Sequence, residues 1–398
     1  SAGFTKEEDT LDGWFDSGST HFAAMKKDQG FWPATMYLEG LDQYRGWFQS
    51  SLLTAVGAFG EGAPFKECVT HGWTVDGEGR AMHKSLGNGV DPADIFNENG
   101  ADILRLWAAS ADYHADVRCS KAIFQQLSQN YLKFRNTCKF MLDNLVDFDP
   151  AHLTKAEDMP VLDRWLITKL NELIEKVEQS YNDYEFHIIT HAVNDFCVTT
   201  LSSFYLDIVK DRLYCEAADS AERRSAQTAL YLTLSTLAKL FAPILAFTCD
   251  EIWLAMPHTA EDDARNVVLN DMNKPFTAYA LDAETMARWE HIIEVRTAVN
   301  GALEEARAAK VIGKSLEADV HLTVPEGDVF LADENPAALA DLFIVSKVEL
   351  TVGGELAVKV ENAAGTKCPR CWKHSLTPNA EGLCPRCAEV VRHLPDLL

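Results

Sequence analysis

The chain has 398 residues, of which 47% are hydrophobic, and this supplies enough apolar side chains for several buried cores. Its formal net charge of -24 argues against a protein that coats nucleic acid indiscriminately, because an acidic surface repels phosphates. No apolar run approaches the roughly 18 to 20 residues that a membrane span requires, and the first residues lack a signal-peptide pattern. We therefore expect a cytoplasmic protein without a membrane partner.

The hydrophobic periodicity changes three times along the chain. Glycine-rich segments that alternate strand-like and helical patterns come first and predict an α/β fold, and long helical periodicities with few glycines then predict a bundle. A further helix followed by alternating strands predicts a small α/β module, and a cysteine-rich tail ends the chain. The expected domains are 1–117, 118–284, 285–362 and 363–398. Within the bundle, the expected helices are 122–145, 161–181, 186–207 and 221–254.

The tail contains two Cys-Pro-Arg-Cys turns, formed by Cys368 with Cys371 and by Cys384 with Cys387, with 12 residues between them. Four thiolates in paired turns form a closed tetrahedral site, and a segment this short cannot fold on a hydrophobic core. The spacing predicts one structural Zn²⁺ ion that stabilises the fold of the tail. A redox dithiol is the alternative, and His374 lies near enough in sequence to compete as a ligand.

A second pattern lies in the first domain, where glycines flank a turn that carries Lys84 and Ser85. Mobile loops with a lysine and a serine at the tip clamp phosphates. Taken alone, the pentapeptide Lys-Ser-Leu-Gly-Asn would equally suit a surface turn.

The sequence from Thr74 to Asn88 resembles the second signature of class I aminoacyl-tRNA synthetases, usually written K-M-S-K-S. Five further segments resemble the isoleucine-specific family, in family order, as does the four-cysteine tail. They are Leu11-Asp-Gly-Trp-Phe-Asp-Ser-Gly18, Glu39-Gly-Leu-Asp-Gln-Tyr-Arg-Gly-Trp-Phe48, Gly100-Ala-Asp-Ile-Leu-Arg-Leu-Trp107, Tyr131-Leu-Lys-Phe-Arg-Asn-Thr137 and Ser203-Phe-Tyr-Leu-Asp-Ile-Val-Lys-Asp-Arg212. The resemblance to isoleucyl-tRNA synthetases thus runs through nearly the whole chain and implies the second half of a class I Rossmann-type catalytic domain, followed by an anticodon-binding bundle.

The resemblance also implies roles for the nucleotide-binding residues. Lys84 would stabilise the charge that develops on the phosphates of ATP, supplied with Mg²⁺, as isoleucine attacks the α-phosphate. Ser85 would donate to the same phosphates, while His71 and the backbone near Thr74 would border the adenine.

The amino-acid site follows from the same resemblance. Glu39, Asp42 and Gln43 would hold the substrate ammonium and the adenylate at the carboxyl edge of a parallel sheet. Trp14 would form one wall of the side-chain pocket, although a tryptophan at such a position also suits ordinary core packing.

The chain departs from the signature at two positions, because Ala81 replaces its first lysine and His83 replaces its serine. Arg80 lies one place earlier than the missing lysine. We hypothesise that Arg80 supplies the missing positive charge.

The start of the bundle is the segment expected to meet tRNA. No acidic residue occurs between Val117 and Leu142, and a helix there would place cations on one face. The candidate phosphate contacts are Arg118, Lys121, Lys133, Arg135 and Lys139. In the tail, Trp372 lies among five basic residues and is expected to contact tRNA near the anticodon. A solvated helix face is the alternative for the charge run.

None of the twelve histidines belongs to an H-x-G-H motif, and the chain has no room for an editing domain. We therefore expect a C-terminal portion of the enzyme that cannot form isoleucyl-adenylate alone. The expected partners are the isoleucine tRNA, L-isoleucine and ATP, and we expect a monomer. A non-catalytic tRNA-binding protein and a valyl or leucyl relative are the alternatives.

Overall fold

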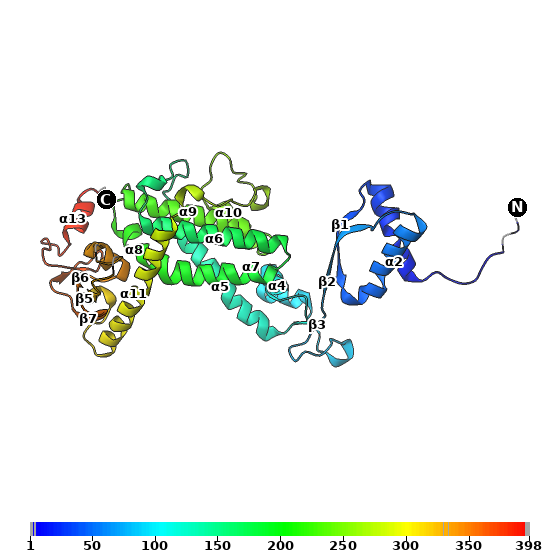
Figure 1. Ribbon diagram of the computed structural model, residues 1–398, viewed down its shortest axis with the longest axis horizontal. Coiled ribbons are helices and arrows are strands. Elements are labelled where there is room, and N and C mark those ends of the chain that lie inside the picture. The colour runs from blue at the N-terminus through cyan, green and yellow to red at the C-terminus, as the bar shows by residue number, and fades with distance from the viewer. Residues whose placement is uncertain (1–2, 4, 329, 333, 395–398) are drawn as a thin grey trace. The chain divides into compact units, whose positions relative to one another are not determined.

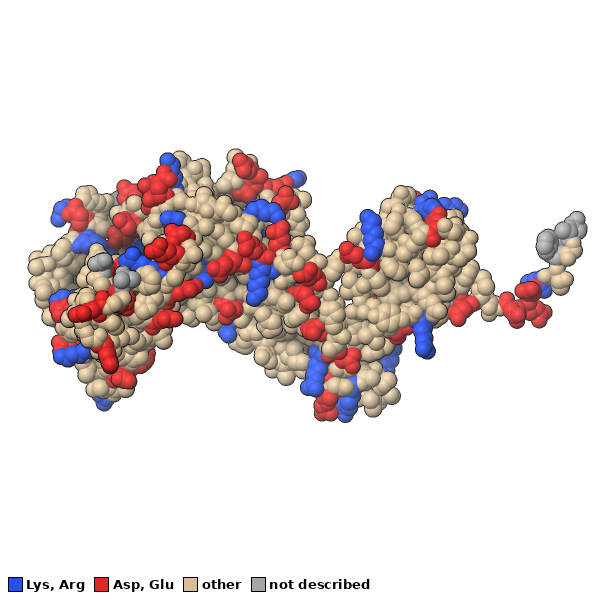
Figure 2. All heavy atoms as spheres, in the orientation of Figure 1, with Lys and Arg blue, Asp and Glu red and all other residues tan. Residues whose placement is uncertain are grey.

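The computed structural model describes residues 3, 5–328, 330–332 and 334–394, and these fall into two compact units, Ser1–Leu127 and Ser128–Leu398. Figure 1 shows their strands and helices, and Figure 2 shows acidic side chains spread over the visible face with basic ones scattered among them. Within the described ranges, every helix is too short or too polar to span a bilayer.

The first unit contains a pair of parallel strands, β1 (Ala34–Gly40) and β2 (Phe65–His71), whose register places Glu39 opposite Thr70 and Gly40 opposite His71. The surrounding segments are α1 (Gly13–Gly18), η1 (His21–Gln29), η2 (Leu41–Arg45), α2 (Trp47–Leu53) and η3 (Thr54–Ala58). Buried Tyr37 stacks on Trp47 at a centroid distance of 4.2 Å. A Cβ on Gly18 would lie 2.5 Å from the Ser50 Cβ, so glycine is required where α1 meets α2.

The rest of this unit carries the signature loop. β3 (Thr74–Val75) pairs in parallel with β4 (Val117–Arg118), and η4 (Lys84–Leu86) lies in the loop after β3. The helices α3 (Pro92–Asn99) and α4 (Ala101–Ser110) follow. Gly72 allows the chain to pass, because a Cβ there would lie 2.4 Å from the Ala115 carbonyl oxygen.

The helical bundle forms the larger part of the second unit, and its helices run side by side in Figure 1. They are α5 (Lys121–Asp143), α6 (Val161–Asn182), α7 (Phe186–Asp195), η6 (Phe196–Tyr205), α8 (Leu206–Cys215), α9 (Ala221–Phe241) and α10 (Ala246–Ala255), with short turns η5 (Ala156–Asp158), η7 (Val267–Leu269) and η8 (Thr277–Tyr279). The helix expected over 221–254 is broken between α9 and α10, where Pro243 lacks a backbone donor. The helix expected over 186–207 contains the π-helical stretch η6 and continues into α8.

The C-terminal part of the same unit begins with α11 (Ala283–Ala308) and η9 (Ser315–Glu317). It then forms a three-stranded sheet in the order β6-β5-β7, in which β5 pairs in parallel with β6 and antiparallel with β7. Its elements are β5 (Ala318–Val324), α12 (Pro336–Phe343), β6 (Lys347–Val352) and β7 (Ala357–Asn362). Fully buried and partly buried residues alternate along β5, so one face of this strand is fully covered. The helices α11 and α12 pack on the neighbouring strands β7 and β6, respectively.

The cysteine module completes the described chain. It consists of the hairpin β8 (Thr366–Lys367) and β9 (His374–Ser375), followed by α13 (Pro385–Arg392). The cap before α13 is Cys384, and Pro385 takes the first helical position, where its missing N–H costs no hydrogen bond.

Candidate functional site

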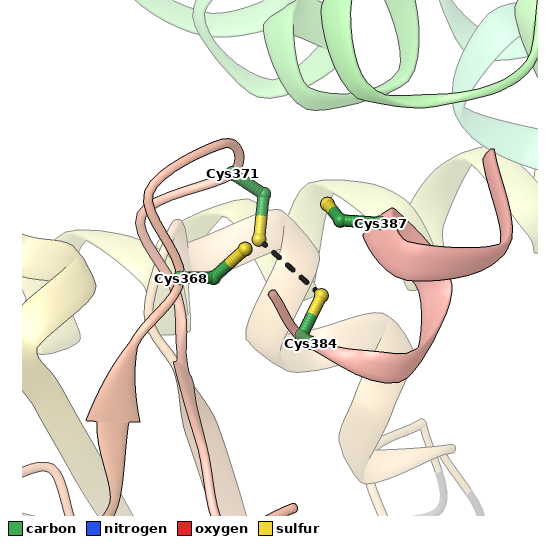
Figure 3. Close-up of side chains that lie close together, drawn as sticks. All are labelled: Cys368, Cys371, Cys384 and Cys387. Atoms are coloured by element: carbon green, nitrogen blue, oxygen red, sulfur yellow. Dashed lines mark hydrogen bonds between the residues drawn. The ribbon is translucent and has the colours of Figure 1, made fainter. Parts of the chain in front are cut away.

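The four tail cysteines converge on one point. Their sulfur atoms all lie within 4.8 Å of one another, and the Sγ atoms of Cys371 and Cys384 are 3.7 Å apart. Figure 3 shows that Cys368 and Cys371 reach this point from the hairpin turn, while Cys384 and Cys387 reach it from the start of α13. A tetrahedral Zn²⁺ with bonds of about 2.3 Å separates its sulfurs by about 3.8 Å, so the spacing fits such an ion.

The environment of these sulfurs also suits a metal. Cys368, Cys371 and Cys387 are buried, and all four thiols are free of disulfide bonds. Burial by itself would raise the pKa of the Cys368 thiol, but the backbone N–H groups of Cys371, Cys384 and Arg370 lower that pKa to about 6. Burial raises the pKa of the Cys371 and Cys387 thiols instead, so the convergence of the four sulfurs, and not their ionisation, supports a metal site.

The basic side chains around the metal site are occupied within the chain. Lys367 pairs with Glu317 at 3.1 Å, Lys373 pairs with Asp341, and Arg392 pairs with Glu389 at 2.6 Å. Arg370 and Arg386 both contact α8. The aromatic residue Trp372 differs from them, because it is 54% exposed, with the Lys314 ammonium over its ring at 5.4 Å.

In the first unit, the turn after β1 gathers the candidate amino-acid site. Asp42 and Gln43 lie in η2, and the Gln43 amide donates to Asp42 Oδ2 at 3.0 Å while its oxygen accepts from the Trp47 N–H at 3.1 Å. The carboxyl ends of β1 and β2 meet at one edge, where Glu39 is the second-last residue of β1 and His71 is the last residue of β2. The structure thus places Glu39, Asp42, Gln43 and His71 near one edge of the strand pair.

Two glycines on this turn let the candidate side chains approach the backbone. A Cβ on Gly40 would lie 2.7 Å from Asp42 Oδ1 and 3.7 Å from the His71 ring. A Cβ on Gly46 would lie 2.7 Å from Gln43 Oε1 and 3.3 Å from the Trp14 ring. Sequence reasoning quoted both glycines within the motif but gave them no role. The signal available in the sequence was that one glycine stands on each side of the Asp42-Gln43 pair.

Trp14 lies in α1, whose cap Asp12 accepts a hydrogen bond from the Trp14 N–H at 2.9 Å. The indole is 44% exposed, so it is not an ordinary core residue within this chain. A Cβ on Gly46 would meet both the Trp14 ring and Gln43 Oε1, so these two side chains border the same glycine.

The signature loop is organised by Asp76. This buried carboxylate accepts hydrogen bonds from the backbone N–H groups of Glu78 and Arg80, from Arg80 Nε and from the Asn88 amide, all within 3.0 Å. These four donors lower the pKa of Asp76, with the Asn88 amide making the largest contribution. Sequence reasoning quoted Asp76 and Asn88 within the signature but gave neither a role. The available signal was the position of Asp76 directly before a glycine-rich turn.

The loop presents its tip to solvent. Lys84 and Ser85 are exposed in η4, which ends at Gly87 with a φ of 61°. Thr74 is exposed on β3, directly before the buried stretch that leads to Asp76. Arg80, the hypothesised replacement for the missing lysine, instead forms ion pairs with Asp76 at 2.9 Å and Glu78 at 3.3 Å.

Three of the five candidate phosphate contacts at the start of the bundle have acidic partners. Lys121 pairs with Glu98 at 3.3 Å, Arg135 with Glu251 at 2.6 Å and Lys139 with Asp143 at 2.7 Å. For Arg118 and Lys133, no acidic partner occurs among the residues that the structure describes.

Lys133 lies in a groove that sequence reasoning did not anticipate. The groove has a volume of about 450 Å³ and is lined by α5, η6 and α8. Asn136 from α5, Ser202 and Ser203 from η6, and Lys210 from α8 provide its polar atoms. Lys210 also borders a second groove of about 430 Å³, which reaches Trp372. Two lysines and an exposed tryptophan therefore border neighbouring grooves along α8.

Comparison with known proteins indicates the family of the chain. The family model of class I tRNA synthetases for isoleucine, leucine, methionine and valine matches residues 1–120, and that of the anticodon-binding domain of tRNA ligases matches residues 163–322. The isoleucine–tRNA ligase of Moorella thermoacetica is 47% identical over 98% of this chain, and that of Syntrophotalea carbinolica is 48% identical over 98%. The chain belongs to the class I aminoacyl-tRNA synthetases.

A solved synthetase shows the same fold. The leucyl-tRNA synthetase of Agrobacterium radiobacter K84, solved in a ternary complex with tRNA, aligns with 90% of this chain at a TM-score of 0.55 and 16% identity. At that identity the likeness concerns the class I fold alone. The chain spans 44% of the Moorella relative and 43% of the Syntrophotalea relative, which is less than half of either protein.

Proposed function

We propose that this chain is part of an isoleucine–tRNA ligase, which activates isoleucine with ATP and transfers it to the isoleucine tRNA. The observation that carries the proposal is the 47% identity to an isoleucine–tRNA ligase over 98% of the chain. The match covers nearly the whole chain, and the isoleucine–tRNA ligases that it matches favour isoleucine over valine or leucine.

In the proposed activation step, the side chains of the β1 turn position the amino acid. Asp42 and Glu39 offer carboxylates to the substrate ammonium, and the hydrogen bond from Gln43 fixes the orientation of Asp42. Trp14 forms a wall of the side-chain pocket. His71 and the backbone at Thr74 border the adenine ring of ATP.

The signature loop provides the positive charge for the phosphates. Lys84 and Ser85 reach the triphosphate, whose Mg²⁺ is bound with the nucleotide, and Lys84 offsets the charge that develops as pyrophosphate leaves. The fixed carboxylate of Asp76 closes the base of the loop, so its exposed tip can move without unfolding.

The tRNA-binding part of the proposal concerns the bundle and the tail. Lys133 borders the first groove, Lys210 borders both grooves and pairs with Asp207 at 2.8 Å, and exposed Trp372 borders the second groove. Lysine ammonium groups suit phosphates, and an exposed indole suits a base. Arg135 and Lys139 lie on α5 with Lys133 and would exchange a carboxylate partner for a phosphate. Arg118 and Lys121, which belong to the first unit, are proposed as separate phosphate contacts.

The four-cysteine site is proposed to hold one structural Zn²⁺. The ion would supply the stability that a module of this size cannot obtain from its own apolar contacts. We also propose the four-part division at 117, 284 and 362, a monomeric state, and no isoleucyl-adenylate synthesis by the chain alone.

The tRNA proposal can be tested on the chain as it is. An isoleucine tRNA transcript should bind more tightly than an unrelated tRNA, and Trp372→Ala should weaken binding by roughly 5- to 150-fold, as the loss of one stacked base does. Lys133→Ala should weaken it less, and Lys155→Ala, at an exposed lysine outside the grooves, should leave it unchanged. Equal affinity for both tRNAs would remove the support for this part of the proposal.

The catalytic proposal requires a full-length enzyme that contains this chain. Such an enzyme should exchange pyrophosphate into ATP with isoleucine in preference to valine or leucine, and it should charge the isoleucine tRNA. Preference for either of the other amino acids would assign the chain to a different member of the family.

A further inference from the structure

The C-terminal end of helix α8 is the point where the cysteine module meets the bundle. Both Cys-Pro-Arg-Cys turns send their arginine there. Arg370 donates to the carbonyl oxygens of Cys215 and, at 3.3 Å, of Tyr214. Arg386 binds both carboxylate oxygens of Asp211, at 2.6 and 2.8 Å, and Glu216 at 2.8 Å.

Helix physics explains why arginines are favoured at this position. The last carbonyl groups of a helix lack partners within the helix, and the helix dipole places negative charge at its C-terminus. Asp211 and Glu216 add two carboxylates to that end of α8. The planar fork of Arg386 matches the Asp211 carboxylate with two parallel hydrogen bonds, which fix direction as well as distance.

The same arginines are also tied to the metal site. Each is flanked by a proline and a candidate ligand, and Arg370 Nη1 lies 3.6 Å from the Cys387 sulfur. The Cys215 side chain packs in one cluster with Cys368, Cys371 and Cys387, so α8 and the metal site share a core. Four thiolates around a divalent ion leave two negative charges, which a guanidinium at Cys387 partly offsets.

Other contacts of the module lead elsewhere. Lys373 pairs with Asp341 of α12, and Lys367 pairs with Glu317 beside β5. The sheet module has its own attachment to the bundle, because Arg296 of α11 lies over the Phe204 ring at 5.2 Å. Among the polar contacts described, attachment of the cysteine module to α8 therefore depends on Arg370 and Arg386.

We propose that Arg370 and Arg386 are positioning residues that dock the cysteine module onto α8 only when the four thiolates share a metal ion. This inference rests on the metal site of the proposed function. The metal joins the turn 368–371 to the start of α13, and this connection holds both guanidinium groups at the angles that α8 requires. Loss of the ion separates the turns, and the groove between Lys210 and Trp372 loses one of its walls.

The test measures zinc content and amide hydrogen exchange of the whole chain. The purified chain should contain one zinc per molecule, and removal of zinc by a chelator should speed exchange in residues 206–216 by about tenfold or more, as their carbonyl partners and packing are lost. Arg386→Gln should produce a similar acceleration while zinc remains bound. Arg386→Lys should restore part of the protection, because lysine keeps the charge but not the fork.

Two variants make the result specific. Asp211→Asn combined with Glu216→Gln removes the α8 side of the contact and leaves every module residue in place, and it should also speed exchange at one zinc per molecule. Arg392→Gln alters an arginine of α13 that pairs only with Glu389 among its described ion pairs, and it should change neither measurement.

The outcomes separate the inference from the proposal beneath it. A chain that binds no zinc would contradict the proposed metal site and the inference together. A chain that binds one zinc but keeps slow exchange in residues 206–216 after chelation would overturn the docking inference alone. Slow exchange in zinc-loaded Arg386→Gln and in the double variant would overturn the positioning role of the arginines.

Discussion

The signature loop and the helical bundle each depend on one buried aspartate, and the two aspartates act over very different ranges. Asp76 accepts its hydrogen bonds from residues 78 to 88, all within one loop. Asp163 on α6 is fully buried and accepts from Tyr205, Arg212 and Ser225, which lie on η6, α8 and α9. The same side chain closes a local turn in one region and joins distant helices in the other.

This difference indicates which region can move. A loop closed by local hydrogen bonds can open without disturbing the core, which suits a segment that must close over a nucleotide. The Asp163 network joins four helical segments, so loss of one of its contacts weakens the packing of the whole bundle. The bundle is thus expected to be the more rigid of the two regions, while the signature loop of the first unit can move by itself.

The largest effect is expected when Asp163 is changed to alanine. The partly buried Arg212 guanidinium would lose its carboxylate partner, and Tyr205 and Ser225 would lose a buried acceptor, so unfolding free energy should fall by about 3 kcal/mol. Chemical denaturation of the chain measures this loss. The exposed control Asp158→Ala should change stability by no more than about 0.5 kcal/mol. If both variants lose equally little, the network does not hold the bundle together.

The next effect concerns the lysine at the loop tip. In a full-length enzyme, Lys84→Ala should slow isoleucine-dependent pyrophosphate exchange by roughly 10²- to 10³-fold, as removal of one transition-state donor does elsewhere. Arg80→Ala should slow it much less, because the Arg80 guanidinium is already paired with Asp76 and Glu78. The exposed control Lys27→Ala should have no effect. An equal loss in the Arg80 and Lys84 variants would restore the hypothesis that Arg80 replaces the missing lysine.

A smaller and more local effect is expected for Asp76→Ala. Loss of the carboxylate should speed amide exchange in residues 77–88 by about tenfold or more, since four donors lose their acceptor. The denaturation midpoint of the helical bundle should stay close to that of the unchanged chain. A large fall in that midpoint would show that Asp76 supports more than its loop.

Much of the fold was predictable because it follows from the local hydrophobic periodicity of the sequence. The helix expected over 161–181 is observed as Val161–Asn182, and the first domain contains the strands that its α/β pattern predicted, β1 and β2, paired in parallel. The break at Pro243 follows a known rule for proline that the long helical periodicity obscured. The π-helical stretch at 196–205 has no such signal, because its hydrophobic pattern differs little from that of an α-helix.

The candidate sites likewise contain some features with a local sequence signal and others without one. The convergence of four cysteines could be predicted, since paired short spacings fix the geometry locally. The pairing of Arg370 and Arg386 with α8 could not, because it joins residues more than 150 positions apart. Sequence alone also suggested free cations around Trp372 that the structure finds in ion pairs. Hydrophobic periodicity does not determine which distant residues a charged side chain will contact.

The smallest effect is a difference in the sign of two titrations. Hydrogen bonds from Asn88 and Arg80 lower the pKa of Asp76 below its ordinary value of 3.8. Burial raises the pKa of Asp163 above 3.8, although Arg212 and two hydroxyl groups oppose the rise. Carboxyl carbon shifts followed by NMR should therefore show Asp76 titrating on the acidic side of 3.8 and Asp163 on the basic side.

The two shifts act on stability in opposite directions. The contribution of Asp76 is fully present above its unfolded pKa of 3.8 and is lost as the pH falls through its lower folded pKa. The contribution from the raised pKa of Asp163 is present below 3.8 and is lost as the pH rises through the folded pKa. Relative to Asp163→Asn, the unchanged chain should lose part of its advantage as the pH rises past 3.8. Relative to Asp76→Asn, it should lose its advantage as the pH falls below 3.8. The same sign in both comparisons would mean that Arg212 outweighs burial at Asp163.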